Sequence, residues 1–481
     1  MPKYSSLQQV QQALHSGAES CEGLVSYYLQ QIEQHADLNI YVEVYAEEAK
    51  EQARKLDQRF RENPQAPGRL HGMVLSLKDV LCYEGHGVTA GSRILEGFES
   101  QFSATAVARL LEEDAIVIGR VNCDEFAMGS TTETSVYGPS RNADNPDYVP
   151  GGSSGGSAVA VQADTCLASL GTDTGGSVRQ PAAFCGIIGV KPTYGRISRY
   201  GLLAYGSSFD QVGVLVNSVE DAALLLEIMA GPDEFDSTSS QTPVPPYSEQ
   251  LDFAGKARIA YFPTALEHPS LDPEVRAASQ QLIEQLRNEG HTIEAVDFDY
   301  LDYIIPAYYV LTTAEASSNL SRYDGIRYGY RSGDAHSLMD TYKKSRTEGF
   351  GTEVKRRIML GTFVLSAGYY DAYYTKAQQV RRLIQEKTLS ILEEYDFILI
   401  PAAPGTAWKL GDTVDDPVAM YLADIFTVQA NMVGIPAVAF PLATHSNGLP
   451  IGLQLMAGKF EEARLLAFLH DVVESVTYSR Q

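Results

Sequence analysis

Two serines in glycine-rich segments and one lysine in an apolar run could together perform acyl transfer. Ser153 lies in GGSSGGSAVAV, Ser177 in LGTDTGGSVRQPAAFCG and Lys78 in HGMVLSLKDVL. A serine hydroxyl attacks a carbonyl once a base removes its proton, and burial lowers the pKa of a lysine so that it can act as that base. Glycines let the backbone approach a ligand closely. The three residues therefore indicate acyl transfer without histidine.

Four other motifs resemble parts of these segments but do not fit. The nucleophile elbow G-x-S-x-G needs a strand directly before it, whereas NADNPDYVP precedes GGSSG. A P-loop ends in G-K-[ST], and Gly155-Gly156 is followed by no lysine. An aspartic-protease site needs a second D-[TS]-G beside DTG at 173–175, and S-x-x-K chemistry needs a serine three residues before a lysine. Neither occurs, so the two serines and Lys78 remain the best candidates.

Composition indicates a soluble globular protein rather than a nucleic-acid-binding, metal-binding or membrane protein. The chain has 481 residues, 44% hydrophobic residues and a net charge of −24, which disfavours binding to phosphate backbones by this chain alone. The five cysteines and nine histidines form no metal-ligand spacing and no disulfide framework. We expect no metal, no membrane segment and no signal peptide, and a cytoplasmic location, or an organelle interior after removal of a targeting segment.

The hydrophobic pattern predicts helices that alternate with strands after a helical start. Residues 5–62 are expected to be helical throughout. The further predicted strands are 73–80, 115–122, 165–173, 258–262, 291–298, 397–402 and 437–442. The further predicted helices are 104–114, 219–231, 272–290 (capped by Asp272, with Pro273 in its first turn), 306–320 and 352–394.

This alternation predicts an α/β fold with a large parallel or mixed sheet covered by helices on both faces. The segment 233–250 is loop-like, but the pattern is similar on both sides of it. We therefore expect one domain over 1–481, with an N-terminal helical layer at 1–65 and an α/β catalytic body at 66–481.

Three sequence blocks resemble the amidase signature family. They are SLKD at 76–79, PGGSSGGSA at 150–158 and GTDTGGSVRQPAAFCG at 171–186. The resemblance implies the amidase signature fold and hydrolysis of carboxamides by a Ser–cis-Ser–Lys triad. Residue by residue, it makes Ser177 the nucleophile, Ser153 the bridging cis-serine and Lys78 the base.

The segment before and at the nucleophile is expected to form the oxyanion hole. Its donors would be the backbone N–H groups of Thr174, Gly175, Gly176 and Ser177.

Further blocks look like one branch of the family, the glutaminase subunits of glutamyl-tRNA(Gln) amidotransferases. They are 122–142, 190–202, 353–374 and 421–442. The resemblance implies glutamine as the substrate. It assigns the glutamine carboxylate to Arg357 and the ammonium to Asp424, with Tyr308 lining the pocket and Ser130 as a further pocket residue.

The branch also implies partners. A B subunit would bind tRNA, phosphorylate Glu-tRNA(Gln) with ATP and Mg2+ and receive the ammonia, and a small C subunit would clasp this chain. This chain itself would need no cofactor, and the sequence leaves open whether Asp-tRNA(Asn) is also amidated. The alternatives are a free-standing amidase acting on a small carboxamide and a catalytically inactive scaffold, which would be expected to lack Lys78 or one of the two serines.

Overall fold

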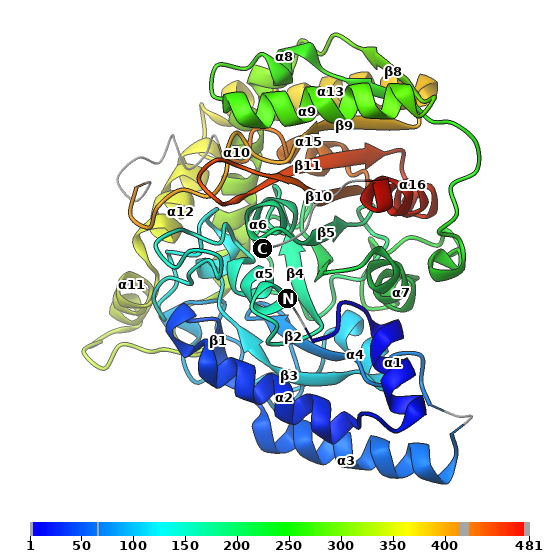
Figure 1. Cartoon of the computed structure of the whole chain (residues 1–481). Helices are drawn as coiled ribbons and strands as arrows, with labels where there is room; N and C mark the ends of the chain where they lie inside the picture. The colour runs from blue at the N-terminus through cyan, green and yellow to red at the C-terminus, as the bar shows by residue number, and fades with distance from the viewer. Residues whose placement is uncertain (1–2, 65–66, 413–422, 476–481) are drawn as a thin grey trace.

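The computed structural model describes residues 3–64, 67–412 and 423–475, and these are organised around one 11-stranded sheet (Figure 1). The strand order is β1-β3-β2-β4-β6-β5-β10-β11-β9-β7-β8. The strands are β1 (Tyr41–Val44), β2 (Val74–Lys78), β3 (Ile116–Val121), β4 (Ala168–Asp173), β5 (Ile188–Lys191), β6 (Gln211–Val216), β7 (Arg258–Tyr261), β8 (Thr292–Ala295), β9 (Phe397–Pro401), β10 (Ala437–Thr444) and β11 (Pro450–Ala457).

The sheet is mixed, as predicted. Strand β2 runs parallel to both β3 and β4, and β7 runs parallel to both β8 and β9. The strands between these two groups pair antiparallel, from β4 through β6, β5, β10 and β11 to β9. Because β2 and β4 are parallel neighbours, their carboxyl ends lie at the same edge of the sheet, where α/β proteins usually bind ligands.

Helices cover both faces of the sheet, with α5 and α6 on the near side in Figure 1. The α-helices are α1 (Leu7–Ser16), α2 (Cys21–Gln34), α3 (Ala46–Glu62), α4 (Thr105–Glu112), α5 (Gly155–Gln162), α6 (Arg179–Cys185), α7 (Val219–Met229), α8 (Pro263–Leu266), α9 (Pro273–Asn288), α10 (Leu301–Asn319), α11 (Leu338–Gly349), α12 (Thr352–Val364), α13 (Lys376–Glu394), α15 (Val428–Val433) and α16 (Glu462–Ser475). Short 3-10 helices are η1 (Ala36–Leu38), η2 (Arg93–Leu95), η3 (Glu125–Ala127), η4 (Tyr247–Glu249) and η5 (Leu320–Arg322), and η6 (Asp371–Thr375) is a π-helical turn.

Local sequence signals account for several helix boundaries. The Asp272 side chain accepts hydrogen bonds from the N–H groups of Glu274 and Val275, and Pro273 occupies the first turn of α9. This confirms the predicted cap, which satisfies amide groups that have no partner inside the helix. Helix α1 begins in the same way at Ser6 and ends at Gly17, whose φ of 73° is easily adopted by glycine.

The predicted all-helical segment 5–62 is not helical throughout: residues 17–20 and 39–40 lie outside the helices, and one part forms a strand. Tyr41–Val44 forms β1, which pairs antiparallel with β3 at the edge of the sheet. The segment VEVYAEEAKE gives little local sign that its first residues form a strand, because the helix-favouring residues of α3 follow the strand directly. Pairing with β3 decides the conformation of β1, and this long-range contact has no local pattern.

Other elements were missed or merged. The elements that were not predicted, besides β1, are strands β5, β6 and β11 and helices α5, α6, α8, α11, α15 and α16. Strands β5 and β6 are buried on both faces, so they lack an alternating pattern. The predicted helix 352–394 is divided into α12, η6 and α13. The division lies near Gly368, whose φ of 92° is incompatible with a continuous α-helix.

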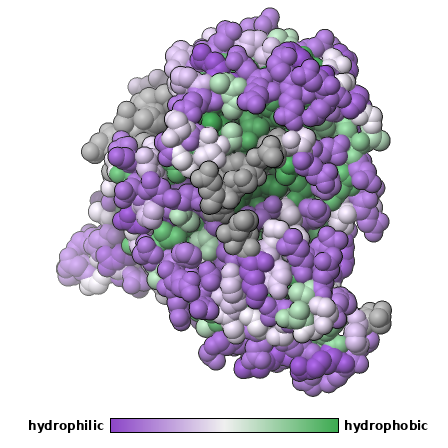
Figure 2. All heavy atoms as spheres, viewed as in Figure 1, coloured by the Kyte–Doolittle hydropathy of each residue, from purple (hydrophilic) through white to green (hydrophobic). Residues whose placement is uncertain are grey.

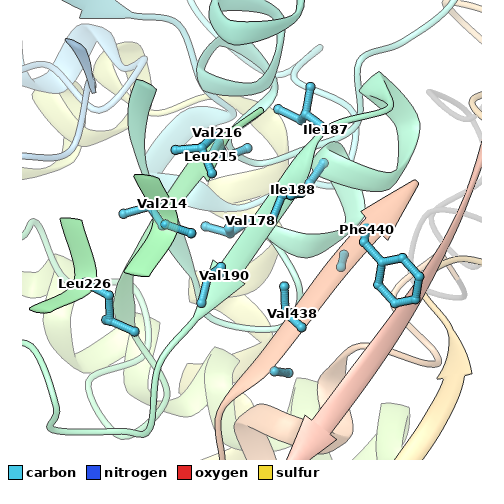
Figure 3. Packing of buried hydrophobic residues seen from close by; sticks show 14 of the residues in the cluster. Val178, Ile187, Ile188, Val190, Val214, Leu215, Val216, Leu226, Val438 and Phe440 are labelled. Atoms are coloured by element: carbon cyan, nitrogen blue, oxygen red, sulfur yellow. The ribbon is translucent and has the colours of Figure 1, made fainter. Parts of the chain in front are cut away.

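The hydrophobic core lies where α6 packs on the central strands. Figure 3 shows Val178 beside Val190 of β5, Val214 of β6 and Val438 of β10. Helix α6 comes close to β5 because Gly189 has no side chain; a Cβ there would lie 2.6 Å from Ala182 Cβ. The outer helices α3 and α9 present mainly hydrophilic side chains, and apolar surface gathers near the middle of the face seen in Figure 2. This core fixes the segment that carries Ser177, the residue directly before Val178.

Candidate active site

The candidate site lies at the carboxyl ends of β2 and β4. Lys78 is the last residue of β2, and Ser177 follows the end of β4 by four residues, just before α6. Ser153 comes shortly before α5, and the peptide bond between Gly152 and Ser153 is cis. Segments distant in sequence therefore lie at one edge of the sheet.

Lys78 donates from Nζ to three hydroxyl groups. These are Ser153 Oγ at 2.7 Å, Ser154 Oγ at 2.9 Å and Thr172 Oγ1 at 2.9 Å. Lys78 is completely buried, and burial lowers its pKa to about 8, although Cys123 and nearby carboxylates oppose the shift. An amine with this pKa is partly neutral near pH 8, so it can accept a proton.

Ser177 is the only one of the three candidate triad residues with access to the surface. It is 9% exposed, whereas Lys78 and Ser153 are 0% exposed. The two serine segments are joined by a backbone hydrogen bond from Ser154 N to Ser177 O at 3.2 Å. Within the described residues, no hydrogen bond joins the Ser153 and Ser177 side chains. Ser177 therefore lies nearer the surface than Lys78 and Ser153.

A buried network that the sequence analysis did not identify holds the Ser177 segment. Asp173 accepts hydrogen bonds from Arg179 Nε and Nη2, both at 2.9 Å, and from Asn431 Nδ2 at 2.9 Å. Arg179 also donates to Thr427 O and to Gln454 Oε1, both at 2.8 Å. The sequence offered a signal, because an acidic and a basic residue flank Ser177 in an otherwise apolar and glycine-rich stretch.

One predicted oxyanion-hole donor has another partner. The Gly176 N–H donates to Asp173 Oδ1 at 2.9 Å, so in this structure it is directed to the carboxylate. The N–H groups of Thr174, Gly175 and Ser177 have no hydrogen-bond partner among the described residues. Gly176 has a φ of 131° and lies against Thr427, which excludes a side chain at this position. The remaining three N–H groups are the better candidates for binding an oxyanion.

Arg357 lies buried on α12 and is held in one orientation by two side chains. Its Nε donates to Glu353 Oε1 at 2.8 Å and its Nη1 donates to Tyr205 Oη at 2.7 Å. The guanidinium also lies 5.3 Å from the ring centroid of Tyr309. Neither Glu353 nor Tyr205 was identified from the sequence. Arg357 is thus a buried cation of fixed direction, suited to binding a carboxylate.

Asp424 and Ser130 form a second polar pair. Ser130 Oγ donates to Asp424 Oδ2 at 2.8 Å, and both residues are buried. Burial raises the pKa of Asp424 to about 7, although the Ser130 hydrogen bond and the nearby charge of Arg357 oppose the increase. The structure therefore brings an anion and a cation close together, the two groups needed to bind a free amino acid.

Tyr308 connects this polar region with the Ser177 segment. A Cβ built on Gly175 would lie 2.5 Å from Tyr308 Oη, so the hydroxyl lies directly against the segment. The Tyr308 ring packs edge-on against Phe209 at a centroid distance of 5.6 Å. The candidate pocket residues from α10, α12 and the segment before α15 thus lie around the same site.

The described residues contain no group of three or more His, Cys, Asp and Glu side chains that could hold a metal ion. Across the same part of the chain, no helix is long and apolar enough to span a membrane. The site that the structure does contain consists of hydroxyls, one buried lysine and backbone amides. A site of this composition suits hydrolysis of an amide by a serine nucleophile.

Comparison with known proteins gives the family. The model of the amidase family matches residues 23–466, so the chain belongs to the amidase family, which confirms the predicted family and fold. Over 464 residues it is 51% identical to the glutamyl-tRNA(Gln) amidotransferase A subunit of Chlorobium phaeobacteroides, covering 96% of this chain and 97% of the relative.

Two solved structures show the same fold. The glutamyl-tRNA(Gln) amidotransferase A subunit of Thermotoga maritima has a TM-score of 0.80 and 36% identity, covering 100% of this chain and 97% of that one. The peptide amidase of Stenotrophomonas maltophilia has a TM-score of 0.82 and 28% identity, covering 100% and 98%. The fold is therefore shared by an amidotransferase subunit and by a peptide amidase.

Proposed function

We propose that this chain is the glutaminase subunit of a glutamyl-tRNA(Gln) amidotransferase complex. The observation that carries the proposal is that buried Arg357 and Asp424 lie close enough for their charges to interact, in a chain that also holds the buried Lys78–Ser153 hydrogen bond. The pair suits the carboxylate and ammonium of a free amino acid, and the lysine and serines suit cleavage of its amide. Identity of about 50% to curated amidotransferase A subunits over nearly the whole chain supports the same assignment.

In the proposed reaction, Ser177 Oγ attacks the side-chain amide carbon of glutamine. Its proton passes to Ser153 Oγ while Ser153 gives its own proton to neutral Lys78 Nζ. The N–H groups of Thr174, Gly175 and Ser177 stabilise the oxyanion. The proton returns through Ser153 to the leaving nitrogen, which departs as ammonia and leaves a glutamyl ester on Ser177.

Water completes the cycle. The Ser153–Lys78 pair takes a proton from the water as it attacks the ester, and the proton returns to Ser177 Oγ when glutamate leaves.

The chain itself uses no cofactor in this scheme. A B subunit would use ATP and Mg2+ to activate Glu-tRNA(Gln), and any amidation of Asp-tRNA(Asn) would depend on the tRNA that this subunit selects. A small C subunit completes the proposed complex, and its setting is cytoplasmic.

The second candidate is a free-standing amidase, supported by the peptide amidase that shares the fold. Glutamate release by the lone chain, and by the chain with its B and C subunits, Glu-tRNA(Gln) and ATP, separates the two functions. We expect weak hydrolysis of glutamine by the lone chain and an increase of at least tenfold in the complex, or about 1.4 kcal/mol of coupling. Rapid cleavage of simple aliphatic and aromatic amides by the lone chain, with glutamine ignored, would favour the free-standing amidase.

A further inference from the structure

Asp210 is a buried carboxylate that the proposed reaction does not use. It is 3% exposed and lies directly before β6. Strand β6 pairs antiparallel with β4, so that Gln211 lies opposite Asp173. Because neighbouring strands of such a ladder run in opposite directions, the next residues along, Asp210 and Thr174, also lie side by side. The sheet therefore places this carboxylate beside the segment that carries Ser177.

Three donors converge on the Asp210 carboxylate. Its Oδ1 accepts from Thr174 Oγ1 at 2.6 Å and from Gly206 N at 3.1 Å, and its Oδ2 accepts from Tyr205 N at 2.9 Å. Burial raises the pKa of Asp210 to about 6, although these three hydrogen bonds oppose the increase. At pH 8 the carboxyl group is therefore ionised, and an ionised carboxyl group acts only as an acceptor.

On one side, the carboxylate holds Thr174 through its side chain. The Thr174 N–H, one of the candidate oxyanion donors, has no hydrogen-bond partner in the part of the chain that the structure describes. The hydroxyl bond to Asp210 thus fixes the residue and leaves its N–H available. An oxyanion donor lowers the barrier only if it already points to the place where negative charge develops. Asp210 is therefore placed to influence amide cleavage through Thr174.

On the other side, the carboxylate holds the turn that carries Tyr205. The turn is closed by a hydrogen bond from Asp210 N to Gly206 O at 2.8 Å, and Asn319 Nδ2 donates to Tyr205 O at 3.1 Å. The Tyr205 hydroxyl in turn accepts from Arg357 Nη1 at 2.7 Å. Tyr205 is only 2% exposed, so its ring has little freedom to follow a displaced guanidinium. The turn that Asp210 holds therefore helps to place Arg357.

We propose that Asp210 is a positioning residue that fixes the oxyanion segment and the Arg357 guanidinium relative to each other. It acts on the oxyanion segment through Thr174 and on the guanidinium through Tyr205. Asp210 itself contacts no reacting atom in this scheme. The inference rests on the proposed function, because it takes the roles of Thr174 and Arg357 from it. One carboxylate then links cleavage of the amide with recognition of the substrate carboxylate.

Asp221 offers a matched control for a carboxylate that is only structural. It is 2% exposed, and its two oxygens both accept from Leu7 N at 3.0 Å. Burial raises its pKa to about 7. The partner Leu7 belongs to α1, which contributes no residue to the candidate site. Asp221→Asn should therefore lower stability while leaving kcat and KM for glutamine within twofold of the unaltered values.

The test measures kcat and KM for glutamine in variants of the full chain. Thr174→Val removes the hydroxyl and keeps the N–H, so kcat should fall about tenfold with little change in KM. Tyr205→Phe removes an acceptor of Arg357, so KM should rise about fivefold with little change in kcat. Thr174→Ser keeps the hydroxyl and should restore most of the kcat that Thr174→Val loses.

Asp210→Asn should produce both effects at once. All three partners donate, so either orientation of the asparagine amide leaves the N–H of Gly206 or Tyr205 facing an NH2 group. Adding Thr174→Val to Asp210→Asn should lower kcat little further, and adding Tyr205→Phe should raise KM little further, because each pair removes the same link. Values of kcat and KM within twofold of the unaltered chain in Asp210→Asn would overturn the inference. Effects that multiply in both double variants would also overturn it.

Labelling of Ser177 by a fluorophosphonate probe gives a measurement that does not require glutamine. The phosphoryl oxygen of the probe takes the place of the oxyanion, so the labelling rate should fall in Thr174→Val and Asp210→Asn but not in Tyr205→Phe. Equal rates in Asp210→Asn and the unaltered chain would overturn the inference even where glutamine is hydrolysed. An unaltered chain that is labelled but does not hydrolyse glutamine would contradict the proposed function, and the labelling rates would still decide whether Asp210 acts through Thr174. Circular dichroism of each variant checks the fold, and if Asp210→Asn does not fold, an unchanged kcat in Thr174→Val overturns the proposal.

Discussion

Arg179 and Asp173 form a completely buried ion pair on either side of Ser177 in the sequence, with Nε and Oδ2 2.9 Å apart. Burial alone would raise the pKa of Asp173, but Arg179 holds it below its usual value. The carboxylate also accepts from the N–H groups of Gly176 and Val178. The pair therefore fixes the backbone immediately before and after the candidate nucleophile.

Replacing one member of this pair should be destabilising. Arg179→Met leaves the Asp173 carboxylate buried without its main counter-charge, so we expect the free energy of unfolding to fall by about 3–5 kcal/mol. Chemical denaturation measures the loss. The matched control is Arg382→Met, which breaks an exposed pair with Glu386 and should change stability by less than about 1 kcal/mol. Equal effects of the two substitutions would contradict the structural role of Arg179.

Ser177→Ala should abolish glutamine hydrolysis while preserving the fold. The substitution removes the attacking oxygen, and we expect kcat to fall by roughly 10⁴-fold or more. Release of glutamate measures activity, and circular dichroism checks the fold. Ser157→Ala is the control, because Ser157 donates to Leu170 O in the same region without contacting Lys78. Activity of Ser177→Ala within tenfold of the unaltered chain would rule out Ser177 as the nucleophile.

The kcat for glutamine hydrolysis should decrease as the pH is lowered below about 8. Lys78 has a pKa of about 8 because it is buried, and only its neutral form accepts a proton. The neutral fraction rises with pH through the pKa and falls about tenfold for each pH unit well below it. We expect kcat to follow that fraction between pH 6 and 9. A kcat that stays constant down to pH 5 would exclude Lys78 as the base.

The KM for glutamine should have its own pH dependence. The pKa of Asp424 is raised to about 7 by burial, and its carboxylate must be ionised to attract the glutamine ammonium. Ionisation increases with pH, so KM should be about tenfold higher at pH 6 than at pH 8. Asp424→Asn should remove this dependence and raise KM, whereas Asp299→Asn, at an exposed position, should retain it. An unchanged pH profile in Asp424→Asn would refute the assignment.

Arg357→Ala should affect substrate binding more than chemistry. A charge-assisted hydrogen bond to the glutamine carboxylate is present in both the ground state and the transition state, so KM should rise by about 10- to 100-fold with a smaller change in kcat. Arg356→Ala is the matched control, because Arg356 also pairs with Glu353 but is exposed. Steady-state kinetics distinguishes the two variants. A loss confined to kcat would assign Arg357 to the chemical step instead.

The sequence pointed to the candidate reactive groups because their chemistry is local and distinctive. Glycine-flanked Ser153 and Ser177 and the lysine within an apolar run could be recognised without knowledge of their positions in space. The longer helices and the α/β class followed from hydrophobic periodicity in the same way, as α9 with its Asp272 cap shows. These features depend on neighbours within a few residues, so a linear pattern records them.

Only the tertiary structure determined which side chains contact one another and which backbone N–H groups already have a hydrogen-bond partner. Thr172 and Ser154 hold Lys78, Tyr205 orients Arg357, and Asp173 takes the Gly176 N–H that the sequence had assigned to the oxyanion hole. Strand β1 likewise forms because β3 is available beside it. Each of these contacts is made by hydrogen bonds, which are directional and form only when the fold brings donor and acceptor into line. Even the hydrogen bond between the residues nearest in sequence, from Gly176 N–H to Asp173, depends on the turn of the backbone after β4. The sequence supplies the functional groups, and the packing of the sheet and helices determines which partner each group contacts.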